Sequence, residues 1–378
     1  MRSLRPLLLA LAACAAPAPP EWRPLFNGTD LAGWVPVNVA PSTFTAREGM
    51  IVCTGQPTGV MRTDRMYENF VLQLEYRHLQ PGGNAGLFVW SDPLPARGVP
   101  FTRSLEVQVM DGVETPDYTS HGDVFSIWGA HFVPDRPHPS GWERCLPSER
   151  RARPAPEWNH YRVTCRDGVI ELEVNGAKVS GGREASPRKG YLCLESEGSE
   201  VHFRNLRILE LPPGEPPLAA ELVAEDAIGL ATAFDGLTLD GWRAADGGAA
   251  DPAHWQVRDG VMWTDGQGGD LVGPALGRRF EVALDWKRSE RASLKQPFLL
   301  PCRLPNITEP GSEDWHRLVV RAEAPSRDRA GTVTMTYDGQ SQGVLVLDAP
   351  WEEERPAVVQ LHPEGMATEF RNIYVRDL

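Results

Sequence analysis

Long apolar runs are missing from this chain. The apolar stretch near its start, residues 6–13, is far too short to span a bilayer, which takes about 20 residues. No other segment could cross a membrane. Few windows of ten or more residues place apolar side chains at helical spacing. The sequence therefore argues against a membrane bundle and against a helical core.

Positive charge and cysteine are also scarce. The 38 Lys and Arg residues face 51 Asp and Glu residues, and the net charge of −13 argues against nucleic acid as a partner. The chain has 6 cysteines and no Cys-x-x-Cys pair. Setting Cys14 aside leaves an odd set, for which the sequence specifies no disulfide pairing. Its members are Cys53, Cys145, Cys165, Cys193 and Cys302.

Turn-forming residues are abundant instead. The chain has 36 Gly, 34 Pro and 12 Trp, and short alternating runs are separated by Gly, Pro, Asn and Asp. This pattern is typical of an all-β sandwich or barrel. A length of 378 residues exceeds what one core usually serves, so two domains are expected.

The first residues have the features of an export signal. A basic start, Met1–Arg5, precedes the apolar stretch, which ends in Leu11-Ala12-Ala13-Cys14. This box resembles the cleavage site of bacterial lipoproteins. It predicts a signal peptide at 1–13, a lipidated Cys14, a tether at 14–21 and an exported protein held on a cell-envelope membrane. The alternative is an ordinary signal peptide with an incidental cysteine.

An internal repeat divides the remainder of the chain. The segment 25–34 recurs as 233–242, and further segments match in the same order. The pairs are 44–51 with 255–262, 158–163 with 315–320, 174–176 with 337–339, and 203–208 with 370–375. We therefore expect a first β-domain at 22–211, a proline-rich linker at 212–227 and a degenerate second copy at 228–378.

The two copies differ in their polar segments. Between Trp286 and Trp315 the second copy has no counterpart of the segments 83–86, 106–108 and 121–123. The scaffold segments are therefore repeated while these polar ones are not. Function is expected in the first copy.

Two strands of the first copy carry polar side chains on one face. In 105–111 and in 70–77, apolar and polar residues alternate at period two. The alternation places Glu106 with Gln108, and Glu75 with Arg77. We expect these faces to form one polar floor beside the turn that contains Asn84. The alternative is that each is the solvated face of an ordinary strand.

Taken together, these motifs resemble the 3-keto-disaccharide hydrolase family. The resemblance rests on Phe-Asn-Gly-x-Asp-Leu-x-Gly-Trp at 26–34, Glu-Tyr-Arg at 75–77, Gly-Asn-x-Gly at 83–86, Glu-Val-Gln at 106–108 and Glu-Trp-Asn at 157–159. It implies concanavalin-like jelly-roll sandwiches in tandem, and a carbohydrate substrate whose sugar is a ketone at C3. The chain departs from the family at Ala85, Trp90 and residues 121–130, which bears on substrate choice.

A ketone at C3 acidifies the C2 proton, so elimination can break the glycosidic bond. The route needs a base, an electrophile at the enolate oxygen and an acid for the leaving group. Glu106 and His121 are the candidate base and acid, with Asp123 orienting His121. Arg77 or a divalent cation could hold the enolate oxygen, although no ligand cluster indicates a metal.

Further residues are candidates for substrate binding, and several alternatives stay open. The binding candidates are Glu75, Arg77, Asn84, Trp90, Gln108 and Trp128. The tryptophans could equally belong to the core, and Asp123 could be a turn former. Direct hydrolysis competes with elimination. A carbohydrate-binding or adhesion sandwich without catalysis is the alternative to an enzyme.

Overall fold

The computed structural model describes residues 21–288, 298–300, 314–325, 330–347 and 358–378. The predicted signal peptide, Cys14 and Cys302 lie outside these residues. Within them, the regular structure is β apart from one 3₁₀ turn at Ala220–Leu222. None of the helical structure in this part of the chain is long and apolar enough to cross a membrane.

Domain one is a sandwich of two antiparallel sheets. The larger sheet has the order β10-β14-β13-β12-β6-β16-β4-β3, with β1 paired to β16. Its strands are β1 (Trp22–Pro24), β3 (Phe44–Arg47), β4 (Met50–Cys53), β6 (Phe70–His78), β10 (His131–Pro134), β12 (Asn159–Arg166), β13 (Val169–Val174), β14 (Ala177–Ser186) and β16 (Val201–Glu210).

The smaller sheet of domain one has the order β11-β9-β8-β7-β15-β5-β2. Its strands are β2 (Trp34–Pro36), β5 (Gly59–Thr63), β7 (Asn84–Ser91), β8 (Ser104–Met110), β9 (Val124–Ile127), β11 (Arg144–Cys145) and β15 (Tyr191–Ser196). Strand β11 lies inside the long segment between Pro134 and Pro156, so that segment is partly ordered into the sheet.

Alternation along β6 and β8 builds the core between these sheets, as the sequence predicts. Leu105, Val107 and Val109 of β8 pack in the same buried cluster as Leu72 and Leu74 of β6. The apolar face of each strand therefore points inward. Consequently the polar faces of β6 and β8 point outward, away from each other, on opposite sides of the sandwich.

Domain two is a second sandwich with the same order of strands. Its larger sheet runs β19-β20-β28-β22-β24-β25-β26 with β17 paired to β28, and its smaller sheet runs β18-β21-β27-β23. The strands are β17 (Ala231–Thr232), β18 (Arg243–Ala244), β19 (Trp255–Arg258), β20 (Val261–Thr264), β21 (Leu271–Ala275), β22 (Arg279–Arg288), β23 (Phe298–Leu299), β24 (His316–Glu323), β25 (Gly331–Tyr337), β26 (Gln340–Leu347), β27 (Val358–Leu361) and β28 (Thr368–Asp377).

The segments matched in sequence adopt matching local structures. The indole Nε1 of Trp34 donates to the Leu25 carbonyl at 2.7 Å, and that of Trp242 donates to the Ala233 carbonyl at 2.8 Å. The hairpin turns at 175–176 and 338–339 both have positive φ at each residue. Asn, Asp and Gly tolerate this left-handed backbone best, which explains why such residues recur in both turns.

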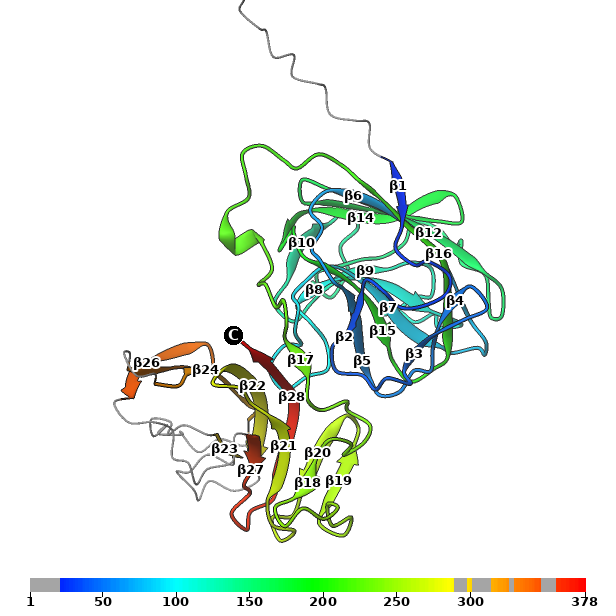
Figure 1. Ribbon diagram of the computed structural model, residues 1–378. Coiled ribbons are helices and arrows are strands. Elements are labelled where there is room, and N and C mark those ends of the chain that lie inside the picture. The colour runs from blue at the N-terminus through cyan, green and yellow to red at the C-terminus, as the bar shows by residue number, and fades with distance from the viewer. Residues whose placement is uncertain (1–20, 289–297, 301–313, 326–329, 348–357) are drawn as a thin grey trace, which may run out of the picture.

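The two domains pack through outward faces of their sheets. Val60, Phe88 and Cys193 on the smaller sheet of domain one share a buried cluster with Ala283 and Tyr374 on the larger sheet of domain two. In Figure 1, β28 lies on the side of domain two that faces domain one. Domain two therefore covers part of the face to which β8 contributes its polar side chains.

Candidate active site

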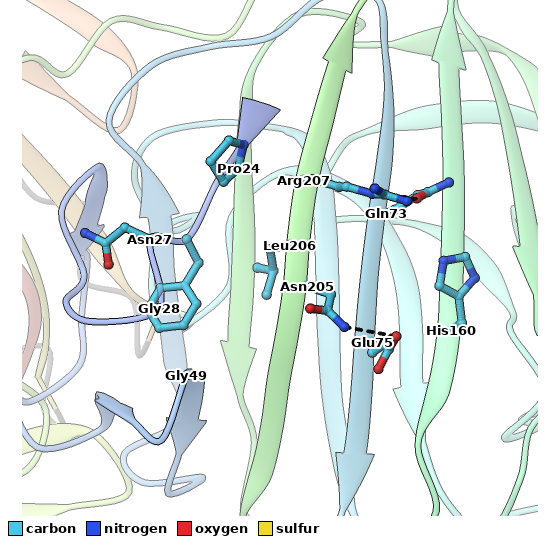
Figure 2. A pocket seen from close by; sticks show the side chains of 11 residues that line it. Pro24, Asn27, Gly28, Gly49, Gln73, Glu75, His160, Asn205, Leu206 and Arg207 are labelled. Carbon is cyan, nitrogen blue, oxygen red and sulfur yellow. Dashed lines mark hydrogen bonds between the residues drawn. The ribbon is translucent and has the colours of Figure 1, made fainter. Parts of the chain in front are cut away.

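The expected shared floor of β6 and β8 is wrong, because the sandwich separates their polar faces. Glu75 and Arg77 lie on the outer face of the larger sheet, where Glu75 borders a cavity (Figure 2). Arg77 places its guanidinium 4.7 Å from the Trp158 ring centre. Neither residue belongs to the group around Glu106. Arg77 therefore cannot hold an enolate oxygen beside Glu106.

Glu106 instead meets carboxylates from β15 and from the residues that follow it. A Cβ placed on Gly86 of β7 would lie 2.7 Å from Oε2 of Glu195 and 2.9 Å from Oε1 of Glu106. Gly86 pairs with Gln108 of the neighbouring strand β8. The absence of a side chain at Gly86 thus lets two carboxylates from strands on either side of β7 converge above it.

Burial controls the protonation of this carboxylate group. Desolvation, reinforced by the charge of Glu197, raises the pKa of Glu106 to about 8, and the Arg144 guanidinium opposes this rise. Desolvation and the charges of Glu106 and Glu197 raise the pKa of Glu195 well above its usual range. Burial also raises the pKa of Glu197. Three like charges cannot all form here, so the group holds protons at neutral pH.

A chain of amide hydrogen bonds connects the site to Asn84, the first residue of β7. Nε2 of Gln108 donates to Oδ1 of Asn84 at 2.8 Å, and Nδ2 of Asn84 donates to Oε2 of Glu197. Oε2 of Glu195, by contrast, is buried without a hydrogen-bond partner among the described residues. The arrangement brings Glu106, Gln108 and Asn84 together as the sequence suggests.

Asp123 has a structural partner other than the predicted one. Its carboxylate accepts hydrogen bonds from Nε of Arg144 at 2.8 Å and from Oγ1 of Thr119 at 2.5 Å. The Arg144 guanidinium lies 4.2 Å from the ring centres of both Tyr118 and Phe125. Asp123 and Arg144 are each almost wholly buried. The carboxylate therefore fixes Arg144, and no hydrogen bond joins it to His121 in the described structure.

His121 lies in the loop before β9 and is half-buried. Desolvation lowers its pKa despite the opposing charge of Asp123, so the ring is neutral at pH 7. Its Nδ1 atom is buried without a hydrogen-bond partner among the described residues. A role for His121 as an acid stays a prediction.

The two tryptophans differ in exposure. Trp90 is fully buried in the core and donates from Nε1 to the Glu68 carbonyl at 2.8 Å. Its φ of 53°, opposite a register shift in β15, turns the ring inward, so the expectation that it stacks on a sugar is wrong. Trp128 is 49% exposed and lines a cavity beside domain two.

Glu195, Glu197 and Arg144 are site residues that the sequence prediction omits. The run 191–197 alternates and would place Glu195 and Glu197 on one face, as 105–110 does for Glu106. The sequence does not show that β15 pairs with β7, which lies about 100 residues earlier in the chain. Arg144 carries no comparable signal, because a two-residue strand leaves no periodicity.

No set of three or more His, Cys, Asp and Glu side chains in the described residues is arranged to hold a metal ion. Glu106 lies on β8, Glu195 on β15 and Glu197 directly after β15, and Nδ2 of Asn84 donates to the Glu197 carboxylate.

Known proteins share features of this chain. The family model of the 3-keto-alpha-glucoside-1,2-lyase-like domain matches residues 21–209. A 3-keto-disaccharide hydrolase of Bacteroides thetaiotaomicron is 36% identical over 135 residues, which are 33% of this chain and 42% of that protein. The chain thus matches less than half the length of this curated relative.

Two solved structures are also similar to part of the chain. A putative glycosyl hydrolase from Parabacteroides distasonis is 24% identical with a TM-score of 0.39, covering 50% of this chain and 94% of that one. A carbohydrate-binding module from Bacillus subtilis is 12% identical with a TM-score of 0.33, covering 47% of this chain and 96% of that one.

Proposed function

This chain belongs to the family of 3-keto-alpha-glucoside-1,2-lyase-like domains, and from this premise we propose that domain one cleaves 3-keto-glycosides by elimination. The observation that carries the proposal is the convergence of Glu106 and Glu195 over Gly86. Two carboxyl groups with raised pKa values in one buried site can supply a base and an acid together.

Glu106 is the base in this scheme. Its carboxylate takes the proton from C2, the electrons of that C–H bond form the C1–C2 double bond by way of the C3 enolate, and the C1–O bond breaks. A pKa of about 8 makes Glu106 a stronger base than an ordinary carboxylate, while a fraction remains ionised near pH 7. Addition of water to the double bond then gives the free 3-keto-sugar.

Glu195 is the acid for the leaving oxygen. Burial and two neighbouring glutamates raise the pKa of Glu195 well above its usual range. Glu195 therefore carries a proton when Glu106 does not. That proton passes to the departing alcohol. Water or the Glu197 carboxyl at the more open edge of the site returns a proton to Glu195.

Arg144 supplies positive charge. Among the described residues, its guanidinium is the cation that acts electrostatically on Glu106. The Asp123 carboxylate and the two flanking rings hold it in one position. A fixed cation in a site of low dielectric stabilises developing enolate charge. A divalent cation in that role is the alternative, and activity in the presence of a chelator distinguishes the two.

The decisive experiment incubates the purified protein with a p-nitrophenyl 3-keto-glucoside and measures nitrophenol release. Wild type should turn the substrate over, and Glu106→Gln should be far slower. Glu171→Gln, at a half-exposed position of β13, should retain the wild-type rate. Binding of the keto-glucoside without release would instead assign the protein to non-catalytic carbohydrate-binding sandwiches.

We also propose that the chain is exported and anchored by lipid on Cys14. The support is the box at 11–14 with the basic and apolar residues before it. In a bacterial expression host, Cys14→Ser should move the mature protein from the membrane fraction to the soluble fraction. A wild-type protein already found in the soluble fraction contradicts the anchor.

A further inference from the structure

A cavity of about 450 Å³ lies on the outer face of the larger sheet of domain one, remote from Gly86 and the carboxylates above it. Figure 2 shows Glu75, His160 and Asn205 on neighbouring strands beside it. The Glu75 carboxylate accepts from Nε of Arg204 at 2.7 Å and from Nδ2 of Asn205 at 3.1 Å. The chemistry proposed for Glu106 uses none of these groups.

Domain two carries a corresponding cluster at the corresponding place in its sheet. On β22, Asp285 lies opposite Arg317 of β24, as Glu75 lies opposite His160 of β12. In the last strands, a bulge places Asn372 at a φ of 51° and Asn205 at a φ of 54°. The two sheets therefore place an acid, a basic residue and an asparagine at equivalent positions, although the acid is bound by Arg204 of β16 in domain one and by Arg317 of β24 in domain two.

In domain two this cluster binds a loop of domain one. Arg317 donates to the Pro95 carbonyl at 2.8 Å, and Arg371 donates to the Gly98 carbonyl at 3.1 Å. The Gly98 N–H donates to Oδ2 of Asp285 at 2.9 Å. Nδ2 of Asn372 donates to the Val99 carbonyl at 2.9 Å. The cluster therefore forms its hydrogen bonds with the backbone of residues 95–99 rather than with their side chains.

Gly98 is required by this contact. Its φ is +74°, and a Cβ at this position would lie 2.3 Å from Cγ of Trp315. A residue with a side chain would thus face both backbone strain and a clash with the indole. The corresponding indole in domain one is that of Trp158, which lies 3.9 Å from the Arg204 guanidinium.

We propose that the Glu75 cluster of domain one is a docking site for a glycine-bearing loop of a partner protein, bound through its backbone as residues 95–99 are bound by domain two. The loop of this chain is already held by its own domain two, so a second copy does not offer it. The partner presents an N–H to Glu75 and carbonyl groups to Arg204 and Asn205, with glycine next to Trp158.

The residues around the cluster are apolar in domain two and polar in domain one, and this difference bears on how strongly a loop would bind to domain one. Domain two surrounds its cluster with Ala283, Val319 and Tyr374, whereas Gln73, Arg162 and Arg207 occupy the paired positions in domain one. The apolar set joins the buried cluster between the domains, whereas Arg207 of the polar set donates to Gln73 at 2.6 Å. Docking on domain one is therefore reversible and dominated by hydrogen bonds.

A cyclic peptide containing Leu94–Phe101 is the probe for this site. Titrated into the full-length protein and followed by calorimetry, it should bind with a Kd of about 1 mM or tighter, and Glu75→Gln should weaken binding at least tenfold. Glu171→Gln is the matched control on the same sheet and should leave binding unchanged. The peptide with Ala in place of Gly98 should not bind.

Binding that survives Glu75→Gln would place the peptide elsewhere and overturn the proposal. The absence of peptide binding would overturn it as well. If cellotriose binds in a manner that depends on Glu75 while the peptide does not, the cavity is a sugar subsite and the proposal is wrong. Nitrophenol release tests the chemistry at Glu106 independently of peptide binding at Glu75. A negative result in the peptide titration therefore does not contradict the proposed elimination, and an inactive protein does not contradict the docking site.

Discussion

Gly86 determines whether two glutamates can meet. A Cβ at this position would point at the ends of Glu195 and Glu106, at distances of 2.7 Å and 2.9 Å from their carboxylate oxygens. Both are carboxyl ends rather than backbone, and the third neighbour is Cε1 of the Phe88 ring at 2.9 Å, so the strand can keep its pairing when these side chains shift. The residue therefore controls the chemistry of the site more than the stability of the sheet.

The first prediction follows from this contact. Gly86→Ala should lower kcat by about tenfold or more, because it displaces both carboxylates by a few tenths of an ångström or more. The melting temperature should change by only a few degrees. Kinetics and thermal melting of the same preparation measure both effects. A variant with wild-type kcat would show that the carboxylates need not converge.

The pH profile of activity provides a second prediction. Glu106 must be ionised to act as a base, and its pKa is about 8, so kcat/KM should rise with pH and level off above that value. Glu195→Gln removes a neighbouring carboxyl whose negative charge repels that of Glu106. The midpoint in this variant should therefore move to lower pH while the maximal rate falls. An unchanged midpoint would show that the ionisation of Glu106 does not depend on Glu195.

Stability should depend on pH in the opposite direction. In the folded protein the pKa of Glu106 is raised from 4.5 to about 8, so the folded state retains a proton that the unfolded chain releases. This contribution is complete below pH 4.5 and is lost as pH rises towards 8. The melting temperature of wild type should fall across this window, and that of Glu106→Gln should fall less. Equal slopes would contradict the raised pKa.

At the scale of single strands, period-two alternation was sufficient to predict the faces of β6 and β8. It placed Leu105 and Leu74 in the core and Glu106 and Glu75 outside it, and the structure agrees. Alternation says nothing about which strands are neighbours. The sequence prediction therefore grouped Glu75 with Glu106, although the two lie on opposite faces of the sandwich. It omitted Glu195, which lies on β15 on the other side of β7.

The two faces of β8 should respond differently to substitution. Leu105→Ala removes a fully buried side chain and should cost roughly 2–5 kcal/mol of stability with little change in the rate per folded molecule. Glu106→Gln should leave the melting temperature the same or higher and reduce the rate. Chemical denaturation and kinetics distinguish the outcomes. Similar effects of both substitutions on stability would contradict the division of the strand.

At the scale of the whole molecule, the repeat predicted a second sandwich, but its position could not be read from the sequence. Domain two lies against Phe88 and Cys193, on the same sheet face as Glu106. The strands β8, β9 and β11 have no counterpart in the described part of domain two. That function lies in domain one stays a prediction.

The contact between the domains depends on Gly98. Gly98→Ala would bring a Cβ to 2.3 Å from Cγ of Trp315, so the loop at 95–99 should leave the Asp285 cluster. Calorimetry should then show two separate unfolding transitions where wild type shows more cooperative unfolding. Gly176→Ala, at a positive φ with no neighbour within 4 Å, is the matched control and should not separate them. A single unchanged transition in Gly98→Ala would contradict the role of this loop.

Proton abstraction by Glu106 is tested by the rate of aglycone release from a 3-keto-glucoside, compared between wild type and Glu106→Gln. Gln preserves the shape of the side chain and removes the base, so kcat should fall by about 10²–10⁴-fold while the fold is retained. Deuterium at C2 of the sugar should slow the wild-type reaction in the same assay. A wild-type rate in Glu106→Gln, with no isotope effect at C2, would contradict proton abstraction by Glu106.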